Sequence, residues 1–119
     1  MIAVIFEVRT AEGQRQRYLD LAAALRAELA EMDGFLSLER FESLTDPGKL
    51  LSLSFWRDEA SIQAWRNRPA HRATQALGRG ALGRGGVFAE YRLRIANVSR
   101  DYGLDDRAEA PADSRAVHL

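Results

Sequence analysis

The sequence predicts an α+β domain in which four strands form one antiparallel sheet and two helical segments cover one of its faces. Its 119 residues suit a single domain, because compact domains usually run to roughly 100–150 residues. Four segments alternate between apolar and polar side chains as strands do. Helical segments separate the first strand from the second and the third from the fourth, so the expected order is β-α-β-β-α-β.

The first strand is expected over residues 2–9, where the even-numbered positions from Ile2 to Val8 are all apolar. An amphipathic helix follows, because apolar residues recur at spacings of 4, 3, 4 and 3. These residues are Tyr18, Ala22, Leu25, Leu29 and Met32. We expect Thr10 to cap the start of this helix and Gly34 to end it, since glycine adopts the left-handed backbone conformation at little cost.

A hairpin is expected next, because residues 35–44 and 50–56 alternate like strands on either side of the turn Thr45-Asp46-Pro47-Gly48. A second helix is expected to begin at Asp58 or Glu59 and to break at Pro69, since proline disfavours the helical conformation of the residue before it. These elements, with a final strand, give the ferredoxin-like arrangement.

The rest of the chain is expected to contain a short helix over 69–77, a glycine-rich connector over 78–86, with a mobile lid as the alternative, and the final strand over 87–102. The glycines of the connector match neither a phosphate-binding loop nor a dinucleotide fingerprint. We therefore expect one domain over residues 1–102. Residues 103–119 are polar, lack a periodic apolar face and are expected to form a tail.

Strand alternation also predicts which side chains face the helices. The expected helix-facing set is Leu36, Leu38, Leu51, Leu53, Phe55, Tyr91, Leu93 and Ile95. The expected opposite face carries Phe35, Phe41, Trp56, Phe88 and Val98 among polar residues. Such a patch is rarely left in water, so we predict a two-fold homodimer whose sheets pack face to face. Glu39 is expected to pair there with Arg92 or Arg94.

Composition excludes several classes of protein. The absence of cysteine rules out disulfide scaffolds, thiolate metal sites and cysteine nucleophiles. No basic leader or stretch of about 20 apolar residues is present, so we expect a soluble cytoplasmic protein that neither spans nor binds a membrane. The 17 basic and 17 acidic residues balance, which disfavours nucleic-acid binding. Seven arginines against one acid between Arg66 and Arg94 are able to attract an anionic ligand.

Several stretches resemble the antibiotic biosynthesis monooxygenase domain family. They are Gly34-Phe35-Leu36-Ser37 leading to Glu39, Phe55-Trp56-Arg57-Asp58-Glu59-Ala60, Ala64-Trp65, His71-Arg72 and the segment from Tyr91 to Tyr102. The resemblance covers roughly residues 2–102 and rests on positions that determine the fold. It implies a dimeric α+β barrel with a pocket between helices and sheet in each subunit. It also implies an oxygenase without cofactor that acts on phenols or quinols, or a protein that binds and degrades heme.

On the oxygenase interpretation, an easily deprotonated phenol reacts with oxygen itself, and the protein supplies an apolar wall, a positive charge and a base. The expected catalytic residues are Trp65, His71 and Arg72. Of these, His71 would be the base, with an unperturbed pKa of about 6.5, and Arg72 or Arg92 would stabilise the anion. The expected substrate-binding residues are Phe6, Tyr18, Phe55, Gln75 and Arg92. No metal ligands are expected, because no cluster has metal-ligand spacing.

Two alternatives stay open. The heme-degrading branch of the family uses an Asn in the first strand, a Trp in the second helix and an axial His beyond that Trp. Trp65 matches the Trp, whereas Phe6 and Gln75 fall at the other two positions. His71 is then a shifted candidate ligand, since neutral imidazole binds iron. The other alternative is a non-catalytic dimer that binds a small ligand, which a collapsed or purely aliphatic pocket would favour.

Overall fold

A computed structural model describes residues 1–69 and 86–115 and confirms the α+β class. The elements are β1 (Ile2–Thr10), α1 (Arg15–Ala30), β2 (Phe35–Glu42), β3 (Lys49–Trp56), α2 (Glu59–Arg66), β4 (Phe88–Asn97) and the short α4 (Ala112–Arg115). The helix expected over 69–77 and almost all of the connector expected over 78–86 lie outside the described residues.

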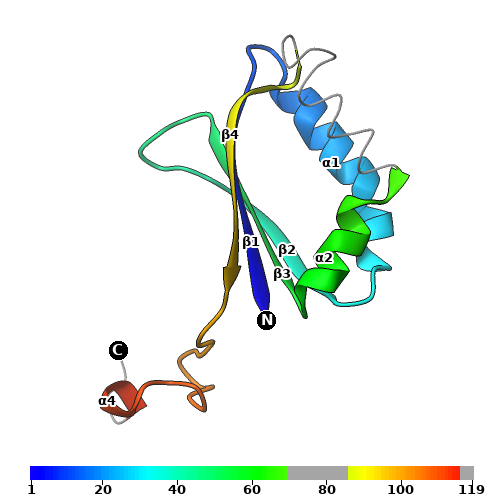
Figure 1. Cartoon of the computed structure of the whole chain (residues 1–119). Helices are drawn as coiled ribbons and strands as arrows, with labels where there is room; N and C mark the ends of the chain where they lie inside the picture. Colours follow the sequence, from blue (N-terminus) through cyan, green and yellow to red (C-terminus); the bar gives the residue numbers. More distant parts are fainter. Residues whose placement is uncertain (70–85, 116–119) are drawn as a thin grey trace.

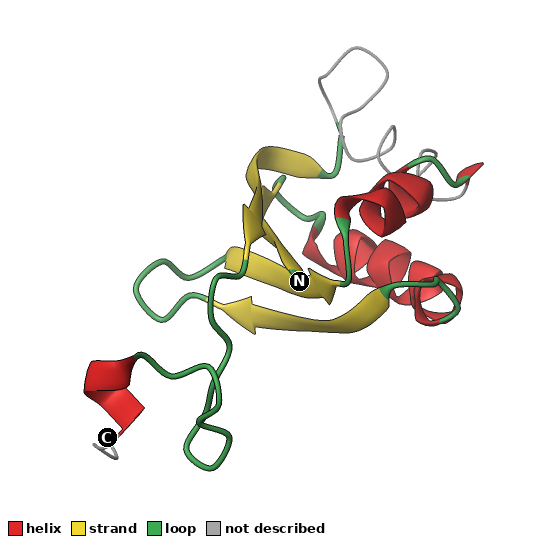
Figure 2. Ribbon diagram, turned by 60° about the horizontal axis from the view of Figure 1, so that its bottom comes forward, coloured by secondary structure: helices red, strands yellow, loops and turns green. Residues whose placement is uncertain are grey.

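The four strands form one antiparallel sheet in the order β2-β3-β1-β4, which confirms the ferredoxin-like arrangement. Helices α1 and α2 lie side by side on one face of this sheet (Figures 1 and 2). We call the other face the open face, because no helix of the described residues covers it (Figure 1). The strand register assigns to it Ala3, Ile5, Glu7, Glu39, Phe41, Leu51, Leu53, Phe55, Arg92, Arg94 and Ala96.

The boundaries of α1 differ in part from the prediction. Thr10 does not cap the helix, because it still belongs to β1 and the next amide, that of Ala11, donates to the carbonyl of Val87 at 2.7 Å. This bond keeps the chain extended, and Gln14 occupies the cap position without a side-chain hydrogen bond. Gly34 has the expected positive φ, 87°, although the helix itself ends at Ala30.

A small polar network fixes the start of α2. Asp58 caps the helix as predicted and accepts hydrogen bonds from the backbone amide of Ser61 at 2.8 Å and from its hydroxyl at 2.7 Å. Arg57 donates to both carboxylate oxygens of Asp33, each at 3.0 Å, and this contact holds the pKa of Asp33 below its usual range. Arg57 and Ser61 together lower the pKa of Asp58. The corner between α1 and β2 is thereby tied to α2, which carries Trp65.

The end of the final strand was predicted too late in the chain. β4 ends at Asn97, and the chain then turns away from the sheet toward α4 (Figure 1). This segment makes its own contacts: the guanidinium of Arg107 lies 5.2 Å from the ring centre of Tyr102, and the amide of Asp101 donates to Glu109 at 3.0 Å. The boundary between a domain and a tail after residue 102 stays a prediction.

The faces of the strands also differ in part from the prediction. Tyr91, Leu93 and Ile95 face the helices as expected, and so does Leu38. Strand β3 is turned the other way. Its residues Ser52, Ser54 and Trp56 lie under the helices, while Leu51, Leu53 and Phe55 lie on the open face. The expected period of two is correct, and the choice of face for β3 was wrong.

Two register shifts explain the remaining differences. One lies between Phe35 and Ser37 on β2, and the other interrupts the pairing of β1 with β4 beside Phe88. An inserted residue exchanges the faces of the side chains before and after it. Phe35 therefore packs on Trp56 with ring centroids 5.3 Å apart, and Phe88 packs on Tyr18 at 5.8 Å, both on the helix side. Leu36, predicted to face the helices, is exposed.

Candidate functional site

A cavity of about 410 Å³ lies between the two helices and the sheet. It is lined by Val4, Phe6, Tyr18, Leu21, Ala22, Leu25, Leu29, Leu38, Arg40, Ser52, Ser54, Trp56, Ile62, Trp65, Arg66, Val87, Phe88, Tyr91, Leu93 and Ile95. The volume falls within the range of roughly 300–1,000 Å³ typical of small-molecule sites. Most lining side chains are apolar or aromatic, and the polar ones are few, as such sites require.

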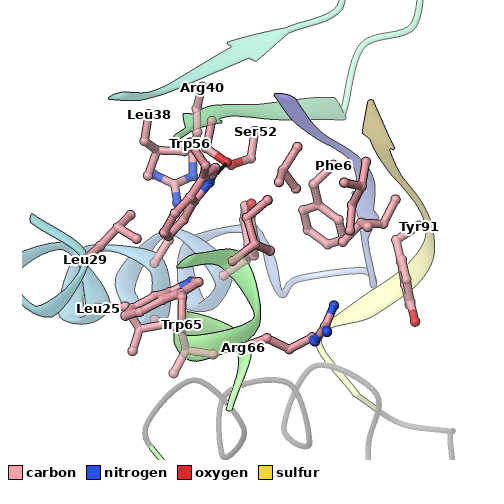
Figure 3. Close-up of a pocket in the computed structure, with 18 of the residues that line it drawn as sticks. Phe6, Leu25, Leu29, Leu38, Arg40, Ser52, Trp56, Trp65, Arg66 and Tyr91 are labelled. Carbon is pink, nitrogen blue, oxygen red and sulfur yellow. Dashed lines mark hydrogen bonds between the residues drawn. The ribbon is translucent and has the colours of Figure 1, made fainter. Parts of the chain in front are cut away.

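The two ends of the cavity have different aromatic walls (Figure 3). Trp56 and Trp65 lie at one end, both buried in a core cluster that includes Leu29. At the other end, Phe6 lies against Tyr91 with ring centroids 5.6 Å apart, and Phe88 lies 5.6 Å from Phe6. Flat aromatic surfaces at both ends suit a planar ring system better than a purely aliphatic chain.

Small hydroxyl residues of β3 leave room at the sheet side of the cavity. The prediction turned leucines of β3 toward the helices, whereas in the structure Ser52 and Ser54 face them, and both serines line the cavity. The indole Nε1 of Trp56 donates to the hydroxyl of Ser54 at 3.0 Å, so this buried donor is satisfied and the ring is held in place. Ser52 makes no hydrogen bond through its side chain within the described part of the chain.

The charged groups of the cavity are two guanidiniums. Arg40 comes from β2 and Arg66 from the last turn of α2. Figure 3 shows Arg40 beside Leu38 on the sheet side and Arg66 on the helix side. Among the described lining residues there is no aspartate or glutamate. The described lining is therefore apolar and aromatic, with two guanidiniums as its charged groups.

The structure brings together three of the residues expected from the sequence. Phe6, Tyr18 and Trp65 all line the cavity. Phe55 and Arg92 do not reach it, because their strand positions place them on the open face. His71, Arg72 and Gln75 lie outside the described residues.

Several lining residues were missed by sequence reasoning. Trp56, Ser52 and Ser54 were assigned to the wrong face, and Arg40 and Arg66 were not considered as site residues. A signal for Arg40 was present in the sequence: it stands two positions after Leu38, which was expected to face the helices, and a strand repeats its faces with a period of two.

The described residues offer no cluster of metal ligands, and the described cavity lining has, apart from tyrosine, none of the usual axial ligands of heme iron. No group of three histidine, cysteine, aspartate or glutamate side chains is placed to hold a metal ion in residues 1–69 and 86–115. The described lining of the cavity also offers no histidine, cysteine or methionine as an axial ligand for heme iron. Within the same ranges, no helix is both long and apolar enough to cross a membrane.

Comparisons with known sequences identify related proteins. The family model described as antibiotic biosynthesis monooxygenase matches residues 1–77. The chain is 46% identical over 99 residues to a protein named jasmonate monooxygenase ABM from Pyricularia oryzae, with 83% of the chain matched. The match spans only 44% of that fungal protein. An uncharacterized Bacillus subtilis protein, YqjZ, is 28% identical over 98 residues, which cover 82% of the chain and 79% of that protein.

Solved structures share the fold. A protein from Mycobacterium tuberculosis superposes with a TM-score of 0.70 at 17% identity, over 86% of this chain and 98% of its own. A Deinococcus radiodurans protein that carries the family's name superposes with a TM-score of 0.69 at 14% identity, over 87% of this chain and 97% of its own. At these identities the likeness shows the fold alone.

Proposed function

The chain belongs to the antibiotic biosynthesis monooxygenase family, and from that premise we propose that it is a monooxygenase that works without metal or flavin. Its substrate on this proposal is a small aromatic phenol or quinol, oxidised by molecular oxygen. The cavity between the helices and the sheet is the proposed site.

The observation that carries this proposal is the cavity itself. Its volume of about 410 Å³, its aromatic ends and its guanidiniums match what an oxygenase of this kind needs from the protein. An ionised phenol is electron-rich enough to react with oxygen, so the protein has to bind it, exclude water and stabilise its negative charge. The condition for the non-catalytic alternative, a collapsed or purely aliphatic pocket, is not met by the described lining.

The proposed reaction balances without an external reductant. In an anthrone-type substrate, the methylene carbon loses two hydrogens and gains one oxygen atom, which makes a carbonyl. The second oxygen atom leaves as water with the two hydrogens, and the substrate supplies all four electrons. Trp65 forms part of the wall against which the ring lies. His71 as the base and Arg72 as a further cation stay proposals on residues outside the described part of the chain.

The fungal relative widens the choice of substrate to test. Its name gives jasmonate as its substrate, and its similarity to this chain covers 44% of its length. We therefore include jasmonate beside anthrone and quinol compounds. The experiment is oxygen uptake in an oxygen electrode with a chelator present, combined with mass spectrometry of the product. Uptake with an anthrone or quinol compound and a gain of one oxygen atom supports the proposal, and no uptake with either contradicts it. Uptake with jasmonate alone contradicts the phenol or quinol as the substrate class.

Titration with hemin separates the heme alternative from the oxygenase. On the oxygenase proposal we expect no Soret shift in the wild type or in His71→Ala. A shift in the wild type that His71→Ala abolishes would establish heme binding through that residue.

We also propose that two copies of this chain pair through their open faces. Phe41, Leu51 and Leu53 place apolar surface on this face, and Phe41 is 43% exposed. Glu39 and Arg92 lie on the two edge strands of the same face, and neither forms an ion pair with a described residue, so a two-fold axis is able to bring Glu39 of one subunit to Arg92 of the other. The apolar centre and the complementary charges favour a second copy as the occupant.

A further inference from the structure

Arg40 and Arg92 are the arginines of the sheet that form no salt bridge with a described residue, and of the two only Arg40 lines the cavity. Arg9, Arg15, Arg57 and Arg94 each pair with at least one carboxylate. Arg40 forms no salt bridge with any described residue, and its Nε is buried without a hydrogen-bond partner. Buried polar atoms are almost always satisfied, so an unpaired Nε beside a cavity favours an acceptor supplied by a ligand, which small shifts of the neighbouring side chains must admit because this nitrogen has almost no exposed surface.

The position of Arg40 directs it to the cavity. It stands on β2 with the helix-facing parity of Leu38, and its neighbour across the strand pair is Ser52 of β3. Both Arg40 and Ser52 line the cavity, and Figure 3 shows both on its sheet side, close to Trp56. The Ser52 hydroxyl is a second donor, and it makes no hydrogen bond with a described side chain. Two donors from adjacent strands thus meet at one place in an otherwise apolar wall.

We propose that Arg40 and Ser52 form a binding site for a negatively charged oxygen of the substrate, either a carboxylate or an ionised phenol. This rests on the proposed function in one respect, that the cavity is the substrate site. It assigns the recognition of charge to β2 and β3, and it names the substrate class as an apolar ring system with an acidic oxygen.

The chemistry of the guanidinium supports this assignment. Its Nε and one terminal nitrogen form a planar fork that matches the two oxygens of a carboxylate and also binds a single oxyanion. No aspartate or glutamate in the described lining competes for that fork. The apolar surroundings strengthen the attraction, because the effective dielectric constant there is lower than in water. A neutral amide of the same shape offers the guanidinium only one carbonyl oxygen and no negative charge, so its hydrogen bond there is weaker.

The test measures binding, so it does not depend on turnover. Quenching of tryptophan fluorescence reports ligand entry, because Trp56 and Trp65 line the cavity. The probes are 2-naphthoate and its neutral isostere 2-naphthamide, which differ in charge at the same position. For the phenol arm, 4-nitrophenol is titrated with pH, because absorbance distinguishes its phenolate from its phenol. We expect the wild type to bind naphthoate more tightly than naphthamide and to lower the pKa of bound 4-nitrophenol.

The variants separate charge recognition from packing. In Arg40→Met we expect binding of naphthoate to weaken roughly tenfold or more, with naphthamide unchanged within about twofold, as expected for loss of a hydrogen bond to a charged group. Arg40→Lys keeps the charge without the fork and is the second variant if Arg40→Met fails to fold; it should lose part of the preference. Ser52→Ala should lose less than Arg40→Met. The matched control is Arg26→Met, an exposed arginine of α1 outside the cavity.

Each outcome is informative. Equal binding of acid and amide in the wild type, or a preference for the acid that survives in both Arg40 variants, overturns the proposal. Loss of the preference in the phenol arm only identifies a phenolate as the ligand, and loss in the carboxylate arm only identifies a carboxylate. If Arg40 governs the preference but no compound consumes oxygen, the anion site stands and the proposed oxygenase function fails. If a compound consumes oxygen but Arg40→Met still binds the acid more tightly than the amide, the oxygenase function stands and the anion site fails.

Discussion

Replacing Gly34 by alanine tests how the corner between α1 and β2 positions α2. Gly34 has φ of 87°, in the left-handed region that alanine disfavours. A Cβ atom added there would lie 2.0 Å from the hydroxyl oxygen of Ser61 and 2.6 Å from its Cβ. Because Ser61 is the buried first-turn residue that Asp58 caps, it cannot move without disturbing the start of α2. Alanine at this position therefore combines backbone strain with a collision.

Gly13 is the matched control, because it separates the two contributions. Its φ is 74°, and an added Cβ would meet nothing within 4 Å. Gly13→Ala thus carries only the backbone strain, about 1 kcal/mol. Gly34→Ala adds the cost of forcing atoms into a packed site, about 1–3 kcal/mol, for a total of roughly 2–4 kcal/mol. Both effects lower the free energy of unfolding.

Urea unfolding followed by tryptophan fluorescence measures the difference. With a slope of about 2 kcal/mol per molar urea, the Gly13 variant should unfold about 0.5 M earlier than the wild type and the Gly34 variant about 1–2 M earlier. All samples need the same protein concentration, since association would shift the midpoint. Equal midpoints for the two variants would refute the close approach of Gly34 to Ser61.

Three further predictions concern the cap, the cavity wall and the open face. The folded-state pKa of Asp58 is lowered, so its stabilisation is present at neutral pH and fades as the pH falls below the ordinary carboxyl value of 3.8; urea midpoints measured from neutral to acidic pH should therefore fall less steeply in Asp58→Asn than in the wild type. Ser54→Ala leaves the indole N–H of Trp56 unpaired and should lower the free energy of unfolding by about 1–3 kcal/mol in the same urea assay, and an unchanged midpoint would contradict the buried hydrogen bond. Leu53→Asp on the open face should give monomers in sedimentation, whereas Leu44→Asp, at a position 99% exposed, should sediment as the wild type does; a folded wild-type monomer at micromolar concentration would contradict the dimer.

The order of elements could be predicted from the sequence because it depends on local periodicity. The spacing of Tyr18, Leu25 and Leu29 specifies a helix whatever it packs against, and Asp58 and Gly34 act through their own backbone geometry. The positive φ of Gly34 and the cap of the second helix depend on nearest neighbours, whereas the first helix ends at Ala30, before the predicted stop. Such signals are readable in one chain.

The sequence could not show which side chains of β3 face the helices. Alternation shows only that successive side chains point to opposite faces of the sheet. Leu51 and Leu53 are more apolar than Ser52, so the simplest expectation turns them toward the helices. The structure turns the serines inward instead, where small side chains leave space for the cavity. When both faces of a sheet carry apolar residues, hydrophobicity does not distinguish the face under the helices from the other face.

The site was predicted only where its residues belong to the helices or to β1. Phe6, Tyr18 and Trp65 line the cavity, because each lies on an apolar stripe of its element that faces the other layer. Arg40 was passed over because a charged residue on a strand is normally assigned to solvent. The role proposed for it depends on a long-range fact, the absence of a hydrogen-bond partner for its Nε, which only the folded chain reveals.

Oxygen uptake by a variant with a filled cavity tests the central claim most directly. Ala22 lines the cavity from α1, and the next residue, Ala23, is exposed on the same helix. Ala22→Phe places a ring in the space proposed for the substrate, and Ala23→Phe adds the same ring outside it. With a compound that the wild type oxidises, we predict that Ala23→Phe keeps the wild-type rate within about twofold, whereas Ala22→Phe, folded by circular dichroism, loses roughly tenfold or more in kcat/KM, since about 1.4 kcal/mol of lost binding corresponds to tenfold. Wild-type oxygen uptake in a folded Ala22→Phe variant would show that the oxidation takes place elsewhere.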